Sequence, residues 1–159
     1  MVQLPDRILK QRAVEVAGID HELASDLVDT MRASPACVGL AAPQLGVGRR
    51  AFALDVSAHP KTTVSHGLVV LFDPEIVEAD GREIGREGCM SVPDLTANVV
   101  RAISIVVRGT SPAGEEVVIS TEGFEARAFQ DEIDHLEGML ILDRVASLAT
   151  DVFRRQVYR

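Results

Sequence analysis

The chain has 159 residues, a length that fits one domain with a substantial core, so we expect residues 1–159 to form a single domain. Hydrophobic residues make up 47% and charged residues 25%, a globular mixture that excludes a disordered chain. The formal net charge of −8 argues against direct binding of nucleic acid, because clustered Lys and Arg side chains hold phosphate backbones.

Membrane and export signals are missing from the sequence. No apolar run approaches the ~20 residues that cross a bilayer, and the first residues lack the charged-then-apolar pattern of a signal peptide. We therefore expect no membrane partner and a cytoplasmic location. The two cysteines, Cys37 and Cys89, indicate no disulfide framework, although a single bridge or a thiolate role stays open.

The first predicted element is a helix that begins after Asp20, a residue type that caps helix N-termini. Its buried face consists of Leu23, Ala24, Leu27, Val28 and Met31. Ser34-Pro35 ends this helix, since a residue before proline is pushed out of helical geometry. Residues 38–48 follow, too rich in glycine for regular structure and too apolar for a solvated linker, so we expect a functional loop.

Short β-rich runs dominate the middle of the chain. They are Ala51–Val56, Gly67–Phe72, Glu75–Ala79, Ala102–Arg108 and Glu116–Ser120. Turn signals such as Asp80-Gly81 and Pro112-Ala113-Gly114 separate these runs and favour antiparallel meanders.

Helical spacing returns after the last of these runs. The apolar positions are Phe124, Ala128, Phe129, Ile133 and Leu136. Thr121 is the predicted cap of this helix and Gly138 its predicted end. Residues 143–158 are compatible with one more amphipathic helix. The predicted class is α+β, with antiparallel sheets packed around a central motif-bearing helix.

Residues 129–138 place the pattern D-E-x-x-H in that helix. Asp131 and His135 are four residues apart and share one helical face, and Glu132 lies beside them. In the related H-E-x-x-H motif, two histidines hold a metal and the glutamate acts as general base. Alone the pattern is weak, because acidic residues near a histidine are common on solvated helical faces.

Two further segments add to this pattern. Residues 87–93, E-G-C-M-S-V-P, place Cys89 between predicted strands, where a thiolate can be a third ligand beside an open position for water. An isolated cysteine is more often a small buried hydrophobe. Residues 39–44, G-L-A-A-P-Q, are by themselves explained as a Gly/Pro loop that packs its apolar residues.

Together, and in this order, the three segments resemble the signature motifs of peptide deformylases, G-x-G-L-A-A-P-Q, E-G-C-L-S and Q-H-E-x-x-H. The resemblance covers essentially the whole chain. It implies that family's fold and the hydrolytic removal of the N-formyl group from N-formylmethionyl peptides, or from a related N-acyl amide. By extension from the family, it also implies association with nascent chains at the ribosome.

The resemblance assigns Cys89, Asp131 and His135 as ligands of one divalent metal. The metal is characteristically iron(II), which zinc, nickel or cobalt can replace. Glu132 becomes the residue that takes a proton from the water activated by the metal and passes it to the departing amine.

The remaining assignments concern the substrate. Gln44 and the backbone N–H of Met90 stabilise the oxyanion that forms at the formyl carbon. Val38, Gly39 and Leu40 belong to an extended segment that pairs with the substrate backbone. The resemblance also pairs Glu87 with Arg101 as a brace for the cysteine loop, against the alternative of an ordinary exposed ion pair.

Three positions depart from the family pattern. Met90 replaces leucine, a nearly neutral change. Cys37 stands at the first glycine of the loop motif, so we expect strain or altered geometry there. Asp131 replaces a histidine ligand, and the shorter, anionic side chain is expected to weaken metal binding or slow turnover.

The substitution at Asp131 leaves two functional hypotheses. One is an active hydrolase with a Cys/Asp/His metal site. The other is a deformylase-fold protein without catalysis that binds a peptide end or a small acyl ligand. A third alternative, an α+β domain with no site, requires all three motif matches to be accidental.

Overall fold

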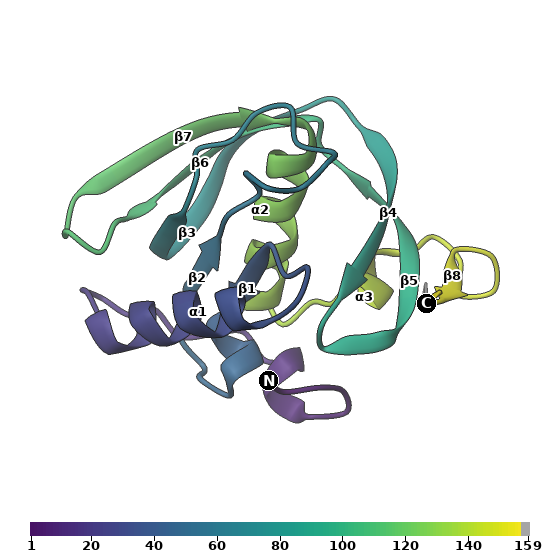
Figure 1. Cartoon of the computed structure of the whole chain (residues 1–159), viewed down its shortest axis with the longest axis horizontal. Helices are drawn as coiled ribbons and strands as arrows, with labels where there is room; N and C mark the ends of the chain where they lie inside the picture. The colour runs from purple at the N-terminus through teal and green to yellow at the C-terminus, as the bar shows by residue number, and fades with distance from the viewer. Residues whose placement is uncertain (157–159) are drawn as a thin grey trace.

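The computed structural model describes residues 1–156 and contains two antiparallel sheets with a helix between them (Figure 1). The larger sheet has the order β1-β2-β3-β6-β7, formed by Gly39–Ala41, Ala51–Leu54, Val69–Asp80, Ser104–Thr110 and Glu116–Glu122. The smaller sheet has the order β4-β5-β8, formed by Glu83–Cys89, Val92–Arg101 and Val152–Arg154. Every strand pair is antiparallel. The predicted α+β class is confirmed.

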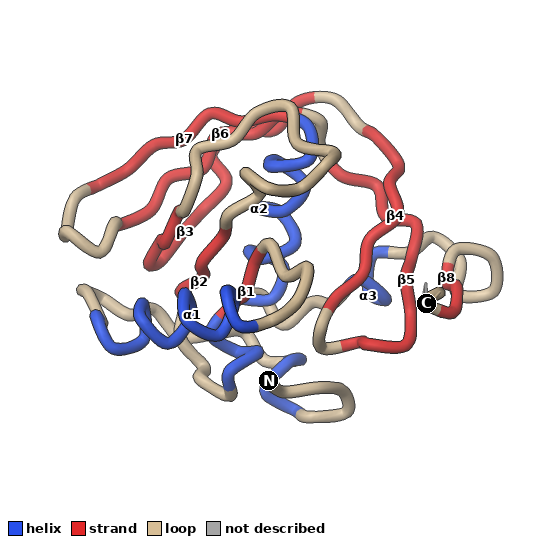
Figure 2. Tube along the Cα trace, viewed as in Figure 1, coloured by secondary structure: helices blue, strands red, loops and turns tan. Residues whose placement is uncertain are grey.

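Three α-helices accompany the sheets: α1 (His21–Ala33), α2 (Gly123–Leu136) and α3 (Ile141–Arg144) (Figure 2). Short 3₁₀ helices lie at Arg7–Lys10 and Ala42–Leu45. As predicted, α1 begins after Asp20, whose carboxylate accepts the backbone N–H of Leu23 at 2.9 Å, and its C-cap is Ser34. Within residues 1–156, none of the helices has the length and apolar character needed to span a bilayer.

Strand β2 is the centre of the hydrophobic core because both of its faces are covered. Phe52 and Leu54 pack with α2, and the rings of Phe52 and Phe129 meet edge to face with centroids 5.6 Å apart. Ala51 and Ala53 point to the other side, toward α1. A strand buried on both faces needs apolar residues throughout, which explains its continuous Ala-Phe-Ala-Leu sequence.

The two predicted runs at 67–72 and 75–79 form one strand, β3. The break predicted between them is an irregularity inside the strand, with a register shift between Phe72 and Glu75 and a positive φ of 48° at Asp73. The Asp73 carboxylate accepts the backbone N–H groups of Val16 and Ala17 at 2.7 and 3.1 Å. These contacts hold the bulged residue in its unusual conformation.

Strands β4 and β5 were not predicted, and the placement of Cys89 between strands was therefore wrong. Cys89 is the last residue of β4, and the two-residue turn Met90-Ser91 leads into β5. Gly85 and Gly88 interrupt the β-rich pattern in this hairpin. Pairing with neighbouring strands overrides these weak local preferences.

The loop predicted at residues 38–48 contains regular structure, β1 and the 3₁₀ helix, because β1 pairs with β2. Thr121 is not the cap of α2. It lies in β7, and Glu122 occupies the N-cap position. The predicted end is confirmed, since α2 stops at Leu136 and Gly138 has a φ of +76°.

The predicted C-terminal helix was also wrong. The described part of residues 143–158 holds only the end of α3, a loop and β8, and residues 157 and 158 lie outside the described residues. The apolar residues Val145 and Val152 pack in the core cluster around Cys89, Ala97 and Ile141. They therefore belong to the core at the smaller sheet and not to the apolar face of a helix.

Candidate metal centre

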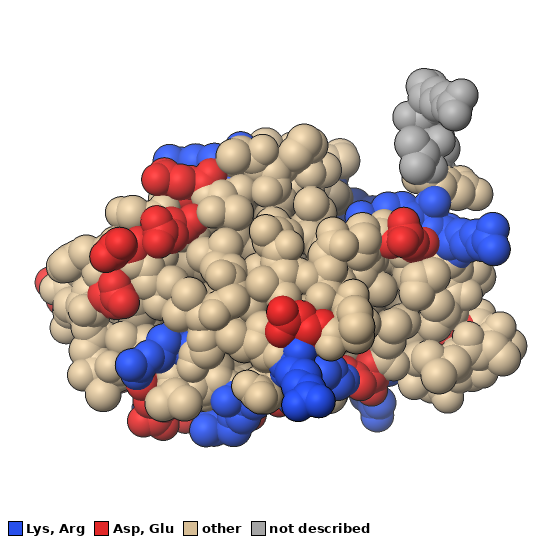
Figure 3. All heavy atoms as spheres, turned by 90° about the horizontal axis from the view of Figure 1, so that it is seen from below, with Lys and Arg blue, Asp and Glu red and all other residues tan. Residues whose placement is uncertain are grey.

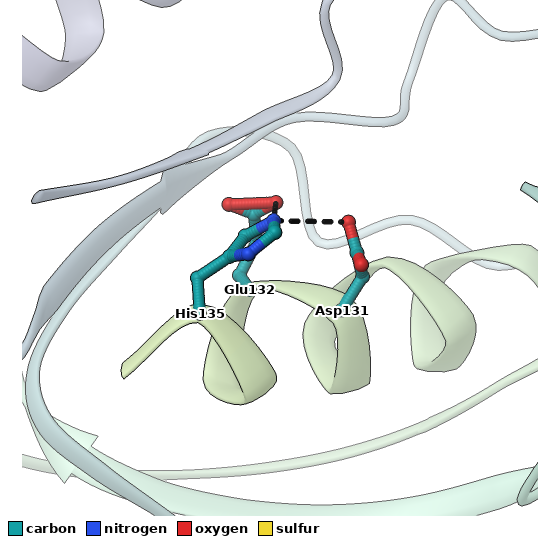
Figure 4. A group of neighbouring side chains, drawn as sticks. All are labelled: Asp131, Glu132 and His135. Carbon is teal, nitrogen blue, oxygen red and sulfur yellow. Dashed lines mark ion pairs between the residues drawn. The ribbon is translucent and has the colours of Figure 1, made fainter. Parts of the chain in front are cut away.

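Helix α2 separates an apolar side from a polar side. Ala126, Phe129, Ile133 and Leu136 pack with the larger sheet, as the helical spacing predicted. Asp131, Glu132 and His135 project from the helix toward one another, as Figure 4 shows. The polar side is also buried, with Glu132 at 4% and His135 at 1% exposure. Burying polar groups costs free energy unless they have partners, so a helix face that is both polar and buried is expected to form a functional site.

The Nε2 atom of His135 is the meeting point of the three predicted ligands. It lies 3.5 Å from Asp131 Oδ2 and 3.6 Å from Cys89 Sγ. The carboxylate of Glu132 is 4.0 Å away. The structure thus brings Cys89, Asp131 and His135 together from β4 and α2, with Glu132 beside them.

A second contact fixes the orientation of the imidazole. His135 Nδ1 lies 3.2 Å from the backbone carbonyl oxygen of Met139. A carbonyl oxygen can only accept, so Nδ1 carries the proton in this hydrogen bond. Nε2 is left facing Cys89 and Asp131, which is the arrangement commonly found for histidine ligands of metals.

The β4–β5 hairpin positions Cys89. The register shifts between Gly88 and Cys89, because Gly88 pairs with Thr96 whereas Cys89 pairs with Val92. Such a bulge turns a side chain away from its regular direction and is frequent next to active sites. Here it accompanies a thiol that faces α2.

Gln44 is 2% exposed and has defined partners at both ends of its amide. Its Oε1 accepts the Ala41 N–H at 3.0 Å, and its Nε2 donates to Ser91 Oγ at 3.2 Å and to Cys89 Sγ at 3.5 Å. The Ser91 hydroxyl in turn donates to the Val2 carbonyl at 2.8 Å. The N-terminal segment therefore supports Gln44 and the cysteine hairpin, a role that no sequence motif indicated.

A cavity of about 360 Å³ opens onto these groups. Val38, Gly39 and Met90 line it, as does Gln44. The predicted substrate residue Leu40 does not line the cavity, because it is fully buried in the core beside α1. A Cβ atom on Gly39 would lie 2.9 Å from Glu132 Cδ, so glycine is needed for β1 to approach the metal face of α2.

The expected strain at Cys37 does not occur at that residue. The positive φ, 57°, belongs to the preceding Ala36. The Cys37 thiol donates to the Gly39 carbonyl at 3.2 Å, and burial raises the pKa of Cys37 to about 11, with Glu132 acting in the same direction. Cys37 is therefore a neutral thiol on the cavity wall.

The pKa values of the Asp131 and Glu132 carboxyl groups are shifted in opposite directions. Burial raises the pKa of Glu132 to about 8. Burial also favours protonated Asp131, but the positive charges of His135 and Arg101 outweigh it and hold the pKa of Asp131 below its usual range. For His135 burial acts downward, whereas Asp131 and Cys89 raise its pKa well above the usual value. Strongly shifted pKa values of this kind are typical of general acid–base sites.

Arg101, 4% exposed at the end of β5, connects the smaller sheet to α2. Its guanidinium donates to both oxygens of Glu87, at 3.0 and 2.9 Å, and also to Asp134. A further N–H reaches Asp131 Oδ1 at 3.4 Å. The predicted Glu87–Arg101 pair is present, and the alternative of an exposed pair was wrong.

Two more arginines complete this network and were missed from the sequence. Arg127 donates to Glu87 Oε2 at 2.7 Å, and Arg144 forms two hydrogen bonds with Asp134, at 2.9 and 2.7 Å. Asp134 occupies a variable position of the D-E-x-x-H pattern, so the motif drew no attention to it. Arginines opposite acidic residues are common in any sequence, and only the fold selects these partners.

The residues present fit a divalent cation. The buried Glu132 Oε2 has no hydrogen-bond partner within residues 1–156, which an ordered water or a ligand proton would supply. Ligand atoms of Asp131, Glu132 and His135 all lie within 4.8 Å of one another, and the Cys89 thiol adds a sulfur. Three mixed ligands with a carboxylate beside an open position are the arrangement of a metal-dependent hydrolase.

Comparison with known proteins gives the same class. Residues 1–151 match the family model described as Polypeptide deformylase. The peptide deformylase of Desulforudis audaxviator is 45% identical, over 98% of this chain and 96% of that protein. The chain therefore belongs to the polypeptide deformylase family, whose members are metal-dependent hydrolases of formylated peptides.

Solved structures agree with this result. The Thermotoga maritima peptide deformylase superposes with a TM-score of 0.82 at 36% identity, covering 92% of this chain and 97% of that one. A class I type b enzyme from Acinetobacter baumannii, solved with Met-Ala-Ser bound, gives a TM-score of 0.81 at 33% identity, covering 91% and 96%. The predicted family and fold are confirmed.

The network around Arg101 predicts a large loss of stability for Arg101→Met. Removing the guanidinium leaves Glu87 and Asp134 as buried charges with fewer partners, which costs about 3–5 kcal/mol of unfolding free energy. Urea denaturation measures the change. Arg108→Met is the control, because Arg108 pairs with Glu75 on the surface and should leave the unfolding midpoint unchanged. Equal midpoints for the two variants would contradict the prediction.

The metal-free protein should lose stability as the pH rises from about 5 to 8. Glu132 ionises near 4.5 in the unfolded chain but near 8 in the folded protein, so the folded state binds the extra proton in this window. The raised pKa of His135 acts in the same direction above pH 6.5. The expected slope is on the order of 1 kcal/mol per pH unit, and Glu132→Gln should flatten it below pH 6.5. Chelated samples denatured across this range test both statements, and a rising profile would refute them.

Proposed function

We propose that this chain removes the N-formyl group from N-formylmethionyl peptides, with Cys89, Asp131 and His135 holding one divalent cation. The observation that carries the proposal is the convergence of these side chains on His135 Nε2, beside the unpartnered and buried Glu132 Oε2. Membership of the deformylase family supplies the reaction. The four residues come from two separate elements, β4 and α2, so their convergence is a property of the fold.

The catalytic steps follow from the charges of the site. A bound divalent metal would act as a Lewis acid that acidifies water and polarises the formyl carbonyl. The Glu132 carboxylate, which lies beside the candidate ligands, can accept a proton from the activated water and pass it to the departing amine. Gln44 Nε2, held 3.5 Å from Cys89 Sγ, can donate to the oxyanion together with the backbone N–H of Met90. Formate and a free peptide N-terminus result.

The edges of the two sheets supply a binding mode for the substrate. β1 is the edge strand of the larger sheet and β4 the edge strand of the smaller one. Val38 and Gly39 on one side and Gly88 on the other line the same cavity. An extended peptide can add to such edges through main-chain hydrogen bonds. The Acinetobacter baumannii enzyme, solved with Met-Ala-Ser bound, supports a peptide as the ligand.

We propose iron(II) as the metal in the cell, with zinc or nickel as replacements, because all three accept thiolate, carboxylate and imidazole ligands. The working compartment is proposed to be the cytoplasm, where the free thiols Cys37 and Cys89 stay reduced. Action on nascent chains near the ribosome follows from a formylated substrate. Residues 1–159 are proposed to act as one domain, since both sheets and α2 contribute to the site.

Anaerobically purified protein should contain about one equivalent of iron or zinc per chain and release formate from formyl-Met-Ala-Ser. Glu132→Gln should lower kcat by about 10²–10⁴-fold and retain the metal, because the residue carries protons and the three ligands are unchanged. Elemental analysis and a formate assay give both readouts. Glu122→Gln, at the exposed N-cap of α2, is the matched control. Protein without metal and without formate release after anaerobic reconstitution would refute the proposal.

The second candidate function is peptide binding without catalysis. It is favoured by one observation, the 3.4 Å contact of Asp131 Oδ1 with Arg101, which competes with a metal for the carboxylate. Under this alternative, Asp131→His should raise metal content and formate release by at least tenfold, because a histidine restores the family's ligand set. If the parent protein already deformylates as fast as Asp131→His, the binding-only function is excluded.

A further inference from the structure

The cavity that leads to the candidate metal site is lined by several cationic side chains, although the protein as a whole is acidic. The chain carries a formal net charge of −8, yet Lys61, Arg86, Arg127 and Arg155 all line the cavity. Arg127 is already paired with Glu87. Within residues 1–156, the other three have no carboxylate partner. We call Lys61, Arg86 and Arg155 the cationic rim.

The members of the cationic rim come from three separate parts of the fold. Arg86 belongs to β4, where its guanidinium lies 3.7 Å from the centre of the Phe153 ring, and its Nε donates to Asn98 Oδ1 at 3.2 Å. Arg155 follows β8. Phe153 and Asn98 set the direction of the Arg86 side chain and leave its charge uncompensated. Figure 3 shows one group of Lys and Arg side chains at the end of the molecule that carries the smaller sheet, with further groups elsewhere on the same face.

Arg155 contacts the backbone of Cys89, one of the candidate metal ligands. Its Nη2 donates to the carbonyl oxygen of Cys89 at 3.4 Å. A Cβ atom on Gly88 would collide with this guanidinium, so the absence of a side chain at residue 88 lets Arg155 lie against β4. The Arg155 side chain thereby lies against residues 88 and 89 of β4, one of the two edge strands between which a peptide is proposed to lie.

Lys61 lies on the loop between β2 and β3, which is anchored to α2. The His59 ring of this loop stacks on Phe124, with centroids 4.1 Å apart, and His59 Nδ1 accepts the Lys61 N–H at 3.1 Å. Farther along the loop, the His66 N–H donates to the buried Glu125 at 2.7 Å. These contacts fix the backbone of Lys61 beside the cavity that it lines, while its side chain is exposed.

Three acidic residues line the cavity: Glu87 and Asp131 are already partnered, and Glu132 is buried beside the candidate metal ligands. Glu87 is bound by Arg101 and Arg127, and Asp131 contacts Arg101 and His135. An incoming anion therefore meets the uncompensated cations of the rim before it meets these carboxylates. Charge-assisted hydrogen bonds from arginine to carboxylate are among the strongest that a partly exposed site can form.

We propose that the cationic rim is an anion subsite that binds a carboxylate of the peptide beyond its first residue. The inference rests on the proposed function, because it places a peptide in the cavity with its N-terminal methionine at the metal. Substrates with Asp or Glu after the first positions, or short peptides with a free C-terminal carboxylate, are therefore preferred over neutral and basic ones. The rim acts on binding and takes no part in the chemical step.

Binding of unformylated peptides to the protein as purified tests the subsite without any need for hydrolysis. The probes are Met-Ala-Glu amide, Met-Ala-Gln amide and Met-Ala-Gln with a free C-terminus, titrated by calorimetry. The Glu peptide should bind about tenfold more tightly than the Gln amide at low salt, and high salt should remove the difference. The free-acid Gln peptide distinguishes a terminal carboxylate from a side-chain carboxylate.

Arg155→Gln should abolish most of the preference for the Glu peptide, and Arg154→Gln should leave it intact. Arg154 is the matched control because it is the neighbouring residue in β8, is exposed and does not line the cavity. Lys61→Gln, on an exposed loop residue, serves as the second variant if Arg155→Gln fails to fold. The preference should fall in this variant as well.

Equal affinities for the Glu and Gln peptides at low salt would overturn the subsite, as would equal effects of Arg155→Gln and Arg154→Gln. Failure of the proposed function has a different signature. Loss of formate release with a retained, Arg155-dependent preference refutes deformylation alone, whereas formate release without the preference refutes the subsite alone.

Discussion

The buried guanidinium of Arg101 is the interaction on which the rest of the site depends. It contacts carboxylates from β4 and from α2, so it fixes the distance between the smaller sheet and the helix. Cys89 belongs to the sheet, whereas Asp131 and His135 belong to the helix. Cys89, Asp131 and His135 therefore meet only while this ion network holds the two elements together. Burying these charges is costly, and their mutual pairing is what makes the arrangement stable.

The aspartate at residue 131 changes the charge balance of this ion network. A histidine at the same position would be neutral, whereas Asp131 adds a negative charge beside Glu87 and Asp134. Arg101 reaches this extra carboxylate through Oδ1, while Oδ2 faces His135. One oxygen is thus compensated by the protein, and the other is directed at the candidate metal position. The same contact explains why both catalysis and binding without catalysis are physically coherent outcomes.

Electrostatics divides the cavity into an inner and an outer part. The inner part holds paired carboxylates and a glutamate whose pKa is raised to about 8 by burial. The outer part carries the cationic rim, in contrast to the acidic surface of the whole chain. The buried reactive groups and the cationic rim proposed to select the ligand have separate functions. Different elements of this fold supply them.

Sequence by itself determined the family, the α+β class and helix α1. It also pointed to Gln44, Cys89, Glu132 and His135, which the fold brings together, because a motif records side chains whose chemistry permits few substitutes. Helix α2 was also visible, since its apolar face repeats at helical spacing. Tertiary structure alone decided the hairpin of β4 and β5, the short strand β8 and the contacts of Arg101 with Asp131 and Asp134. Glycines weaken the local β pattern of that hairpin, and only pairing across the chain compensates for them. Likewise, Arg155 meets Gly88 and Cys89 through sheet packing across 66 residues of sequence, a contact that no local pattern records.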